Sequence, residues 1–145
     1  MDIVNAVLEK NKDFYLDQIE SETSFRKIHS MITEILDNAE AQGKNAGAFL
    51  REYLPKARVY IEYQNARGLI KDGLASILNS FIDELISSTS NSQGNEGQAG
   101  RGGNGGNLQV DLRRRIRNFR LFLDSLAVIA KLTKKEKGRR KNEKR

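Results

Sequence analysis

Apolar residues recur at intervals of three and four along most of this chain, and this spacing constrains its fold more than any other feature. One such run consists of Phe25, Ile28, Ile32, Ile35, Leu36 and Ala39. Because an α-helix returns to the same face every 3.6 residues, the spacing gathers these side chains on one side of a helix. The chain also has a single proline and few threonines or valines, which argues against a sheet. We therefore expect an all-α protein.

Five segments carry this helical pattern: residues 2–20, 24–43, 46–71, 74–85 and 108–130. Ser24 is expected to cap the second segment, because a serine hydroxyl accepts a hydrogen bond from a backbone amide of the first turn. Pro55 lacks a backbone donor, so we expect a kink or a restart of the third segment with Pro55 in a first turn. Gly73 is expected to set off the fourth. The sequence thus predicts a compact bundle of about five helices.

A glycine-rich stretch, residues 88–107, separates the last two helical patterns. Seven of its 20 residues are glycine, and Ala99 is its only apolar residue. Such a stretch buries too little surface to offset its ordering entropy, so we expect a flexible linker. It would span about 25 Å on average, which lets the final helix pack on its own bundle or on a neighbouring copy. We expect a bundle over 1–87, the linker, a final helix over 108–132, and a disordered basic tail over 133–145.

Positive charge is concentrated at the C-terminal end of the chain. The formal net charge is +6, and residues 131–145 contain nine Lys or Arg against two Glu. Residues 1–107 instead contain eleven basic and fifteen acidic residues. Clustered cations gain free energy by displacing counterions from phosphates, so the partner is expected to be a polyanion. The tail alone is an unspecific signal, and a solubilising role is the alternative.

The residue types that most catalytic sites need are scarce. The chain has no cysteine and one histidine, His29. Thiolate metal sites and thiol nucleophiles are therefore excluded, and no phosphate-binding loop, zincin motif or Ser/His/Asp triad can be assembled. His29 lies beside the apolar side of its helix, where a histidine is usually a packing residue. We expect no enzymatic activity, no metal and no cofactor.

The N-terminus shows no basic segment followed by an apolar stretch of the kind found in signal peptides. Nowhere does the chain approach the ~18 consecutive apolar residues that predict a membrane-spanning helix. We therefore expect a soluble cytoplasmic protein that does not associate with membranes.

Two cations and two aromatic residues share one stripe of the helix expected over residues 46–71. They are Lys56, Tyr60, Tyr63 and Arg67, spaced by four, three and four. They fall within about 60° of arc, where cations can contact phosphates and tyrosines can stack on bases. The alternative is that both tyrosines extend the core and the cations are merely solvated.

The final helix carries a second set of cations on one side: Arg113, Arg117, Arg120 and Lys131. Asp124 lies among them and is expected to pair with Arg120, four residues away. A solvated face normally mixes charges of both signs, whereas this one has four cations and one carboxylate. These four cations are therefore candidates for binding nucleic acid, the same partner as for the stripe over residues 56–67.

The same helix is apolar on two sides. Opposite its core face, Leu121, Val128 and Leu132 form a second apolar row, with Ser125 between them. A helix with two apolar sides needs two partners, so this row is expected to be a subunit contact. We therefore expect a homo-oligomer formed through the final helix.

Two stretches of the chain carry a resemblance to a known family. The first is Lys56-Ala57-Arg58-Val59-Tyr60-Ile61-Glu62-Tyr63-Gln64-Asn65-Ala66-Arg67, in which a lysine, an Ala-Tyr-like pair and a following arginine share one helix. The second runs from Phe119 to Lys131, with an aromatic pair, an acidic residue, small and apolar residues and a basic end. The first stretch resembles the small helical subunit of the type III-A CRISPR interference complex, the Csm complex, and the second is similar to that family's final helix. The resemblance covers roughly residues 25–71 and 112–131.

This resemblance implies a compact helical bundle that acts as a non-catalytic subunit. Several copies would stack along the guide RNA and contact the target RNA without reading its sequence, next to the other subunits of the complex. Lys56 and Arg67 are the residues that the resemblance implies for backbone contacts, with basic residues of the final helix behind them. The main alternative is a helical adaptor whose groove binds a protein partner and whose basic tail is incidental. A DNA-associated architectural protein is a third interpretation.

Overall fold

The computed structural model describes the backbone of residues 3–94 and 104–143 and the side chains of residues 3–89 and 110–133. Its elements are α1 (Ile3–Asn5), a turn of π-helix (Ala6–Lys10), α2 (Lys12–Gln18), α3 (Glu22–Ala41), a 3₁₀ turn (Gly43–Asn45), α4 (Ala46–Ala66), α5 (Asp72–Gly94) and α6 (Asn104–Glu143). Within the described ranges there is no strand, only an isolated bridge between Ile19 and Ile70. The all-α prediction is confirmed, with six α-helices rather than about five.

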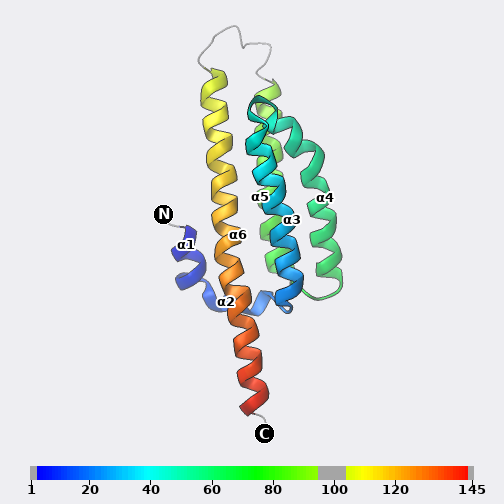
Figure 1. The fold of residues 1–145 in the computed structure, drawn as a ribbon, viewed down its shortest axis with the longest axis vertical. Coiled ribbons are helices and arrows are strands. Elements are labelled where there is room, and N and C mark those ends of the chain that lie inside the picture. The colour runs from blue at the N-terminus through cyan, green and yellow to red at the C-terminus, as the bar shows by residue number, and fades with distance from the viewer. Residues whose placement is uncertain (1–2, 95–103, 144–145) are drawn as a thin grey trace.

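The four long helices α3 to α6 run side by side along the long axis of the molecule (Figure 1). α4 packs against α3 and α5, whereas α6 packs against α3, α5 and the N-terminal helices. α4 and α6 therefore lie on opposite edges of the bundle, and α6 extends past its lower end (Figure 1). The last helix packs on its own chain, which is the first of the two placements that the linker length allows.

The predicted apolar faces form the core. The fully buried side chains include Phe25, Ile28, Ile32 and Leu36 of α3, Leu50, Leu54 and Ile61 of α4, Leu74, Leu78 and Ile82 of α5, and Phe119, Leu123 and Leu126 of α6. Aromatic contacts hold α6 in place. The Phe81 ring stacks on Phe119 and Phe122, with centroids 4.9 and 4.8 Å away, and Tyr15 meets Phe122 edge-on at 5.7 Å. These rings join α6 to α5 and to α2.

The cap of α3 differs from the prediction. Ser21 is the capping residue, and its hydroxyl accepts a hydrogen bond from the Ser24 backbone N–H at 3.1 Å. Ser24 is itself buried in the first turn. The helix thus begins at Glu22, before Phe25, where the apolar pattern starts. At its other end Gly43 has φ 57°, a left-handed conformation that favours glycine and ends the helix close to the predicted residue.

The expected restart at Pro55 is wrong, because α4 continues from Ala46 to Ala66 with Pro55 inside it. The proline is exposed, whereas Leu54 and Ala57 on either side are buried in the core. Their burial holds the helix together despite the lost backbone hydrogen bond. α4 ends before Gly68, which has φ 77°, and not at Lys71.

Gly73 does not separate two helices but lies in the first turn of α5. A Cβ atom at this position would lie 2.8 Å from Gln18 Oε1 and 2.9 Å from Phe14 Cζ. The same Gln18 oxygen accepts a hydrogen bond from the Leu74 N–H at 3.0 Å, so α2 caps the start of α5. A larger residue at position 73 would have to displace the Gln18 amide and the Phe14 ring.

Helix extends into both ends of the range 88–107 expected as a linker, because α5 continues to Gly94 and α6 begins at Asn104. Thr89 is buried, and its carbonyl accepts a hydrogen bond from Arg51 of α4 at 3.4 Å. This contact with α4 explains why α5 continues beyond Leu85, where its predicted apolar pattern ends. Residues 95–103 of the predicted linker lie outside the described residues. Residues 133–143, expected to be disordered, are the helical end of α6.

The aromatic contacts of α6 lead to a test of the fold. Phe119→Ala should lower the free energy of unfolding by about 3–5 kcal/mol, because it empties a fully buried ring site. Val59→Ala on the exposed face of α4 is the control and should change it by less than about 0.5 kcal/mol. Urea unfolding followed by circular dichroism measures both. Equal midpoints for the two variants would contradict this packing of α6.

Candidate nucleic-acid interface

The outer side of α4 carries the first candidate surface. Tyr63 is 57% exposed, and the guanidinium carbon of Arg67 lies 5.5 Å from the centroid of its ring. This distance is within the range of a cation–π contact. Arg67 also caps the end of α4 through its N–H, which donates to the Tyr63 carbonyl at 3.1 Å. An aromatic face and a guanidinium are thus presented together to solvent.

The two tyrosines of the predicted stripe differ in environment. Tyr60 is half-buried and packs against the core, which is the structural role left open for both tyrosines. Tyr63 points outward. Lys56 is exposed, with its Nζ 4.8 Å from the centroid of the Tyr53 ring. The stripe is therefore narrower than predicted, and Tyr60 belongs to the core margin.

Val59 completes this surface and was missed by the sequence analysis. It is 70% exposed, three residues after Lys56 and four before Tyr63. This spacing places all three on one face of the helix. An isolated valine gives no sequence signal of its own here, and its exposure in the structure is what assigns it to this surface. The name "α4 surface" is used below for Lys56, Val59, Tyr63 and Arg67.

Arg58 is another exposed cation of α4, but unlike the two cations of the α4 surface it is paired with a carboxylate. Arg58 Nη1 donates to Asp83 Oδ1 of α5 at 2.6 Å. Within the described part of the chain, neither Lys56 nor Arg67 forms an ion pair with a carboxylate. Their charges are thus available to an anionic ligand, whereas Arg58 is engaged in joining α4 to α5.

An open groove of about 340 Å³ between α4 and α5 limits where an anion can bind. Its lining includes the carboxylates Glu62, Asp72 and Asp83. Asn79 within it is buried and donates to Glu62 Oε1 at 2.6 Å. Arg58 also lines the groove, but the three carboxylates outnumber it, so the outer side of α4 is the more favourable side for an anion.

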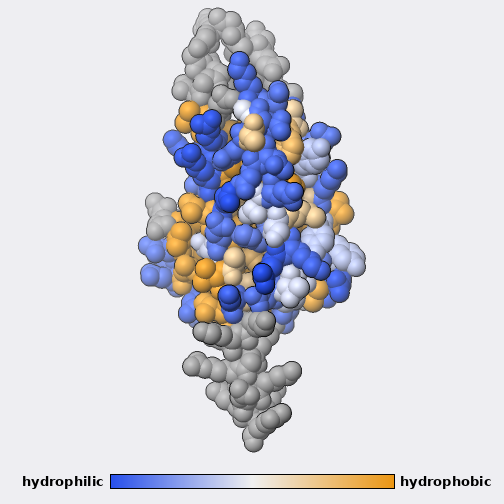
Figure 2. Space-filling view, in the orientation of Figure 1, coloured by the Kyte–Doolittle hydropathy of each residue, from blue (hydrophilic) through white to orange (hydrophobic). Residues whose placement is uncertain are grey.

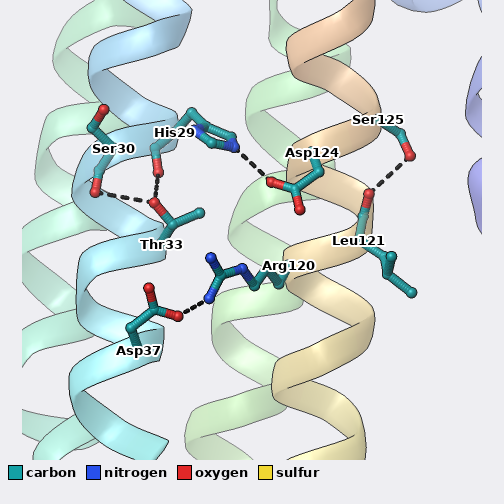
Figure 3. A network of polar contacts seen from close by, with 8 residues as sticks. All are labelled: His29, Ser30, Thr33, Asp37, Arg120, Leu121, Asp124 and Ser125. Atoms are coloured by element: carbon teal, nitrogen blue, oxygen red, sulfur yellow. Dashed lines mark hydrogen bonds and ion pairs between the residues drawn. The ribbon is translucent and has the colours of Figure 1, made fainter.

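Arg120 and Asp124 do not form the expected pair within α6. Arg120 forms an ion pair with Asp37, and Asp124 Oδ1 lies 2.8 Å from His29 Nε2, so both side chains point toward α3 (Figure 3). Partners across the helix interface are nearer than the residue one turn away. His29 thus contributes a polar contact between α3 and α6, and Arg120 is occupied within the bundle.

The other three predicted cations of α6 are Arg113, Arg117 and Lys131. All three are exposed, and no ion pair of theirs is found among the side chains of residues 3–89 and 110–133. They are called the α6 basic face below. The structure does not bring them together with the α4 surface, since α4 and α6 occupy opposite edges of the bundle (Figure 1). The candidate residues therefore form two separate surfaces.

Two further cations act within the fold. Arg115 joins α6 to α5 by donating to Glu84 at 2.6 Å, and it also donates to Asp111 of its own helix at 3.0 Å. The hydrogen bond that it donates to Asp111 is the main cause that raises the pKa of Arg115. The pKa of Lys71 is raised by its hydrogen bond to Asp17 in the neighbouring N-terminal segment. Both side chains stay charged at neutral pH, but their charge is neutralised locally.

The predicted subunit contact is exposed in part. Leu121 and Val128 are 46% and 49% exposed, and Leu132 is half-buried. Ser125 is buried and donates a hydrogen bond to the Leu121 carbonyl at 2.8 Å. Val110, which the sequence analysis missed, is 59% exposed. Figure 2 shows hydrophobic surface at the lower left, where α6 lies beside the N-terminal helices in Figure 1.

The described side chains contain no group of three or more His, Asp or Glu placed to hold a metal ion. In the described ranges, no helix is both long enough and apolar enough to cross a membrane.

The different environments of the two tyrosines can be tested by stability. Tyr60→Ala should lower the free energy of unfolding by about 1–3 kcal/mol, because it removes packing at the core margin. Tyr63→Ala should change it by less than about 0.5 kcal/mol, because that ring is largely exposed. Thermal melting followed by circular dichroism gives both values. A loss for Tyr63→Ala as large as that for Tyr60→Ala would mean that Tyr63 also belongs to the core.

Comparisons with protein-family models, with curated proteins and with solved structures found no match to this chain.

Proposed function

We propose that this protein is a non-catalytic, RNA-binding structural subunit of a type III-A CRISPR effector complex, and that it contacts guide and target RNA without reading their sequence. The observation that carries the proposal is the exposed Tyr63 ring beside Arg67 on α4, with Lys56 on the same face and neither cation paired to a described carboxylate. The first stretch that resembles the Csm subunit begins and ends at these two cations.

The α4 surface has the parts that a single RNA strand needs. Lys56 and Arg67 are eleven residues apart, which separates them by about 16 Å along the helix. In this proposal they bind phosphates of one strand, while Tyr63 between them stacks on a base or a ribose. Backbone contacts and stacking are available to every nucleotide, so the binding would not depend on sequence.

The α6 basic face supplies a second contact on the opposite edge of the bundle. A helical protein with cations on two edges can lie between two stretches of nucleic acid, which suits a subunit that is stacked along a ribonucleoprotein. The C-terminal segment of the sequence adds attraction of a less specific kind, because residues 131–145 contain nine Lys or Arg.

The proposal predicts separate effects for stacking and charge on the α4 surface. Tyr63→Ala should weaken binding of the full chain to a labelled single-stranded RNA by about 5- to 150-fold, with little change in salt dependence. Lys56→Ala and Arg67→Ala should each lower the slope of log affinity against log salt by about 0.7. Fluorescence anisotropy at several salt concentrations measures both quantities.

Arg58→Ala is the matched control, since Arg58 is an exposed cation of the same helix that is already paired with Asp83. It should leave the affinity within about twofold of the parent, because charge at that site is neutralised locally. If Tyr63→Ala, Lys56→Ala and Arg67→Ala all bind RNA like their folded parent, the α4 surface is ordinary helix surface. The RNA contact would then have to be sought on the α6 basic face.

A further inference from the structure

An apolar row runs along the exposed side of α6, and the described residues leave it uncovered. It is formed by Val110, Leu121, Val128 and the half-buried Leu132. Leu121 points away from α3, whereas Arg120 and Asp124 point toward it (Figure 3). The Ser125 hydroxyl already donates to the Leu121 carbonyl, so it brings no unpaired donor to the row. Burial of the row therefore leaves no unsatisfied polar group at Ser125. Arg114 and Arg117 lie between Val110 and Leu121 on the same side of the helix.

The spacing of this row allows the rows of two antiparallel copies to pair with each other. Val110 lies eleven residues before Leu121, and Leu132 lies eleven residues after it. If two α6 helices cross antiparallel at Leu121, Val110 of one copy lies level with Leu132 of the other, about 16 Å from the crossing point. Leu121 then meets Leu121 on the two-fold axis, and the contact between Val110 and Leu132 forms twice, once on each side of that axis.

The remaining position of the row also fits this alignment. Val128 lies seven residues after Leu121, and Arg114 lies seven residues before it. Arg114 is exposed. Its aliphatic stem can cover Val128 of the other copy while the guanidinium reaches solvent.

Charge selects the antiparallel arrangement. A parallel pair would place two C-terminal ends side by side, each with nine Lys or Arg in residues 131–145. An antiparallel pair places these ends at opposite ends of the assembly. It also brings Arg117 close in register to Asp124 of the other copy, whose side chain is 52% exposed and bonds to His29 through Oδ1. That carboxylate can thus accept a second, intermolecular partner.

We infer that the exposed side of α6 binds the same side of a second copy of this chain, antiparallel and centred on Leu121. This goes beyond the proposed function, because it names the register of a self-association that does not require RNA. The α4 surface lies on the opposite edge of the bundle and stays accessible in the pair.

The chain has no cysteine, so single introduced cysteines report on this register directly. Leu121→Cys should form a disulfide-linked dimer under mild oxidation, because the two-fold axis brings its two copies to bonding distance. Val110→Cys mixed with Leu132→Cys should cross-link to each other more than to themselves. Val59→Cys is the control, since it is an exposed valine on α4. We expect at least tenfold more dimer for Leu121→Cys than for this control.

The outcomes separate the register from other modes of association. Self-linked Val110→Cys and Leu132→Cys without the mixed product would indicate a parallel pair and overturn the inference. Equal dimer yields for Leu121→Cys and Val59→Cys would overturn it as well, because they would reflect random collision.

A second measurement does not depend on disulfide chemistry. Sedimentation of the full chain should show self-association that Leu121→Glu abolishes, with the helical signal in circular dichroism retained because Leu121 is partly exposed. Association should persist from about 0.1 M to about 0.5 M salt, since it is apolar and salt screens repulsion between the basic faces, whereas RNA binding weakens steeply. A monomer at all concentrations would overturn the inference but leave the RNA proposal standing. Loss of RNA binding in the α4 variants with association intact bears only on the proposed function.

Discussion

Aromatic rings pack α6 against its own bundle and so determine which of its faces stays exposed. Phe119 and Phe122 stack on Phe81, and burial of this face turns the opposite face of the helix outward. Two polar contacts to α3, Arg120 with Asp37 and Asp124 with His29, fix the rotation of α6 about its axis. The position of the basic face and of the apolar row beside it follows from that rotation.

Core packing likewise determines which face of α4 is exposed at the other edge of the bundle. Burial of Leu54, Ala57 and Ile61 leaves one side of the helix to solvent. Tyr60 and Tyr63 are only three residues apart, yet one lies at the core margin and the other presents its ring outward. The two edges carry separate chemistry, an aromatic ring with cations on α4 and cations beside apolar residues on α6. In our account the first binds RNA and the second combines RNA contact with self-association.

Helical periodicity predicts the core of this protein well, because burial repeats along each helix every 3.6 residues whatever its neighbours are. Interhelical partners could not be predicted in this way. Arg120 was expected to pair with Asp124, but each found a partner on α3, and only the arrangement of helices decides which residues meet. Tertiary packing also explains why α4 continues past Pro55 and why α5 continues past Thr89. For the candidate site, periodicity predicted the face of α4, but exposure was needed to separate Tyr63 from Tyr60 and to find Val59.

The central claim is that RNA contacts the folded bundle on α4 and not only the basic end of the chain. Photocrosslinking of the full-length protein to single-stranded RNA that contains 4-thiouridine, followed by peptide mapping, tests it most directly. We expect crosslinks at Tyr63 on the α4 surface, with further crosslinks on α6. Crosslinks confined to residues 134–145, with none on α4, would contradict it.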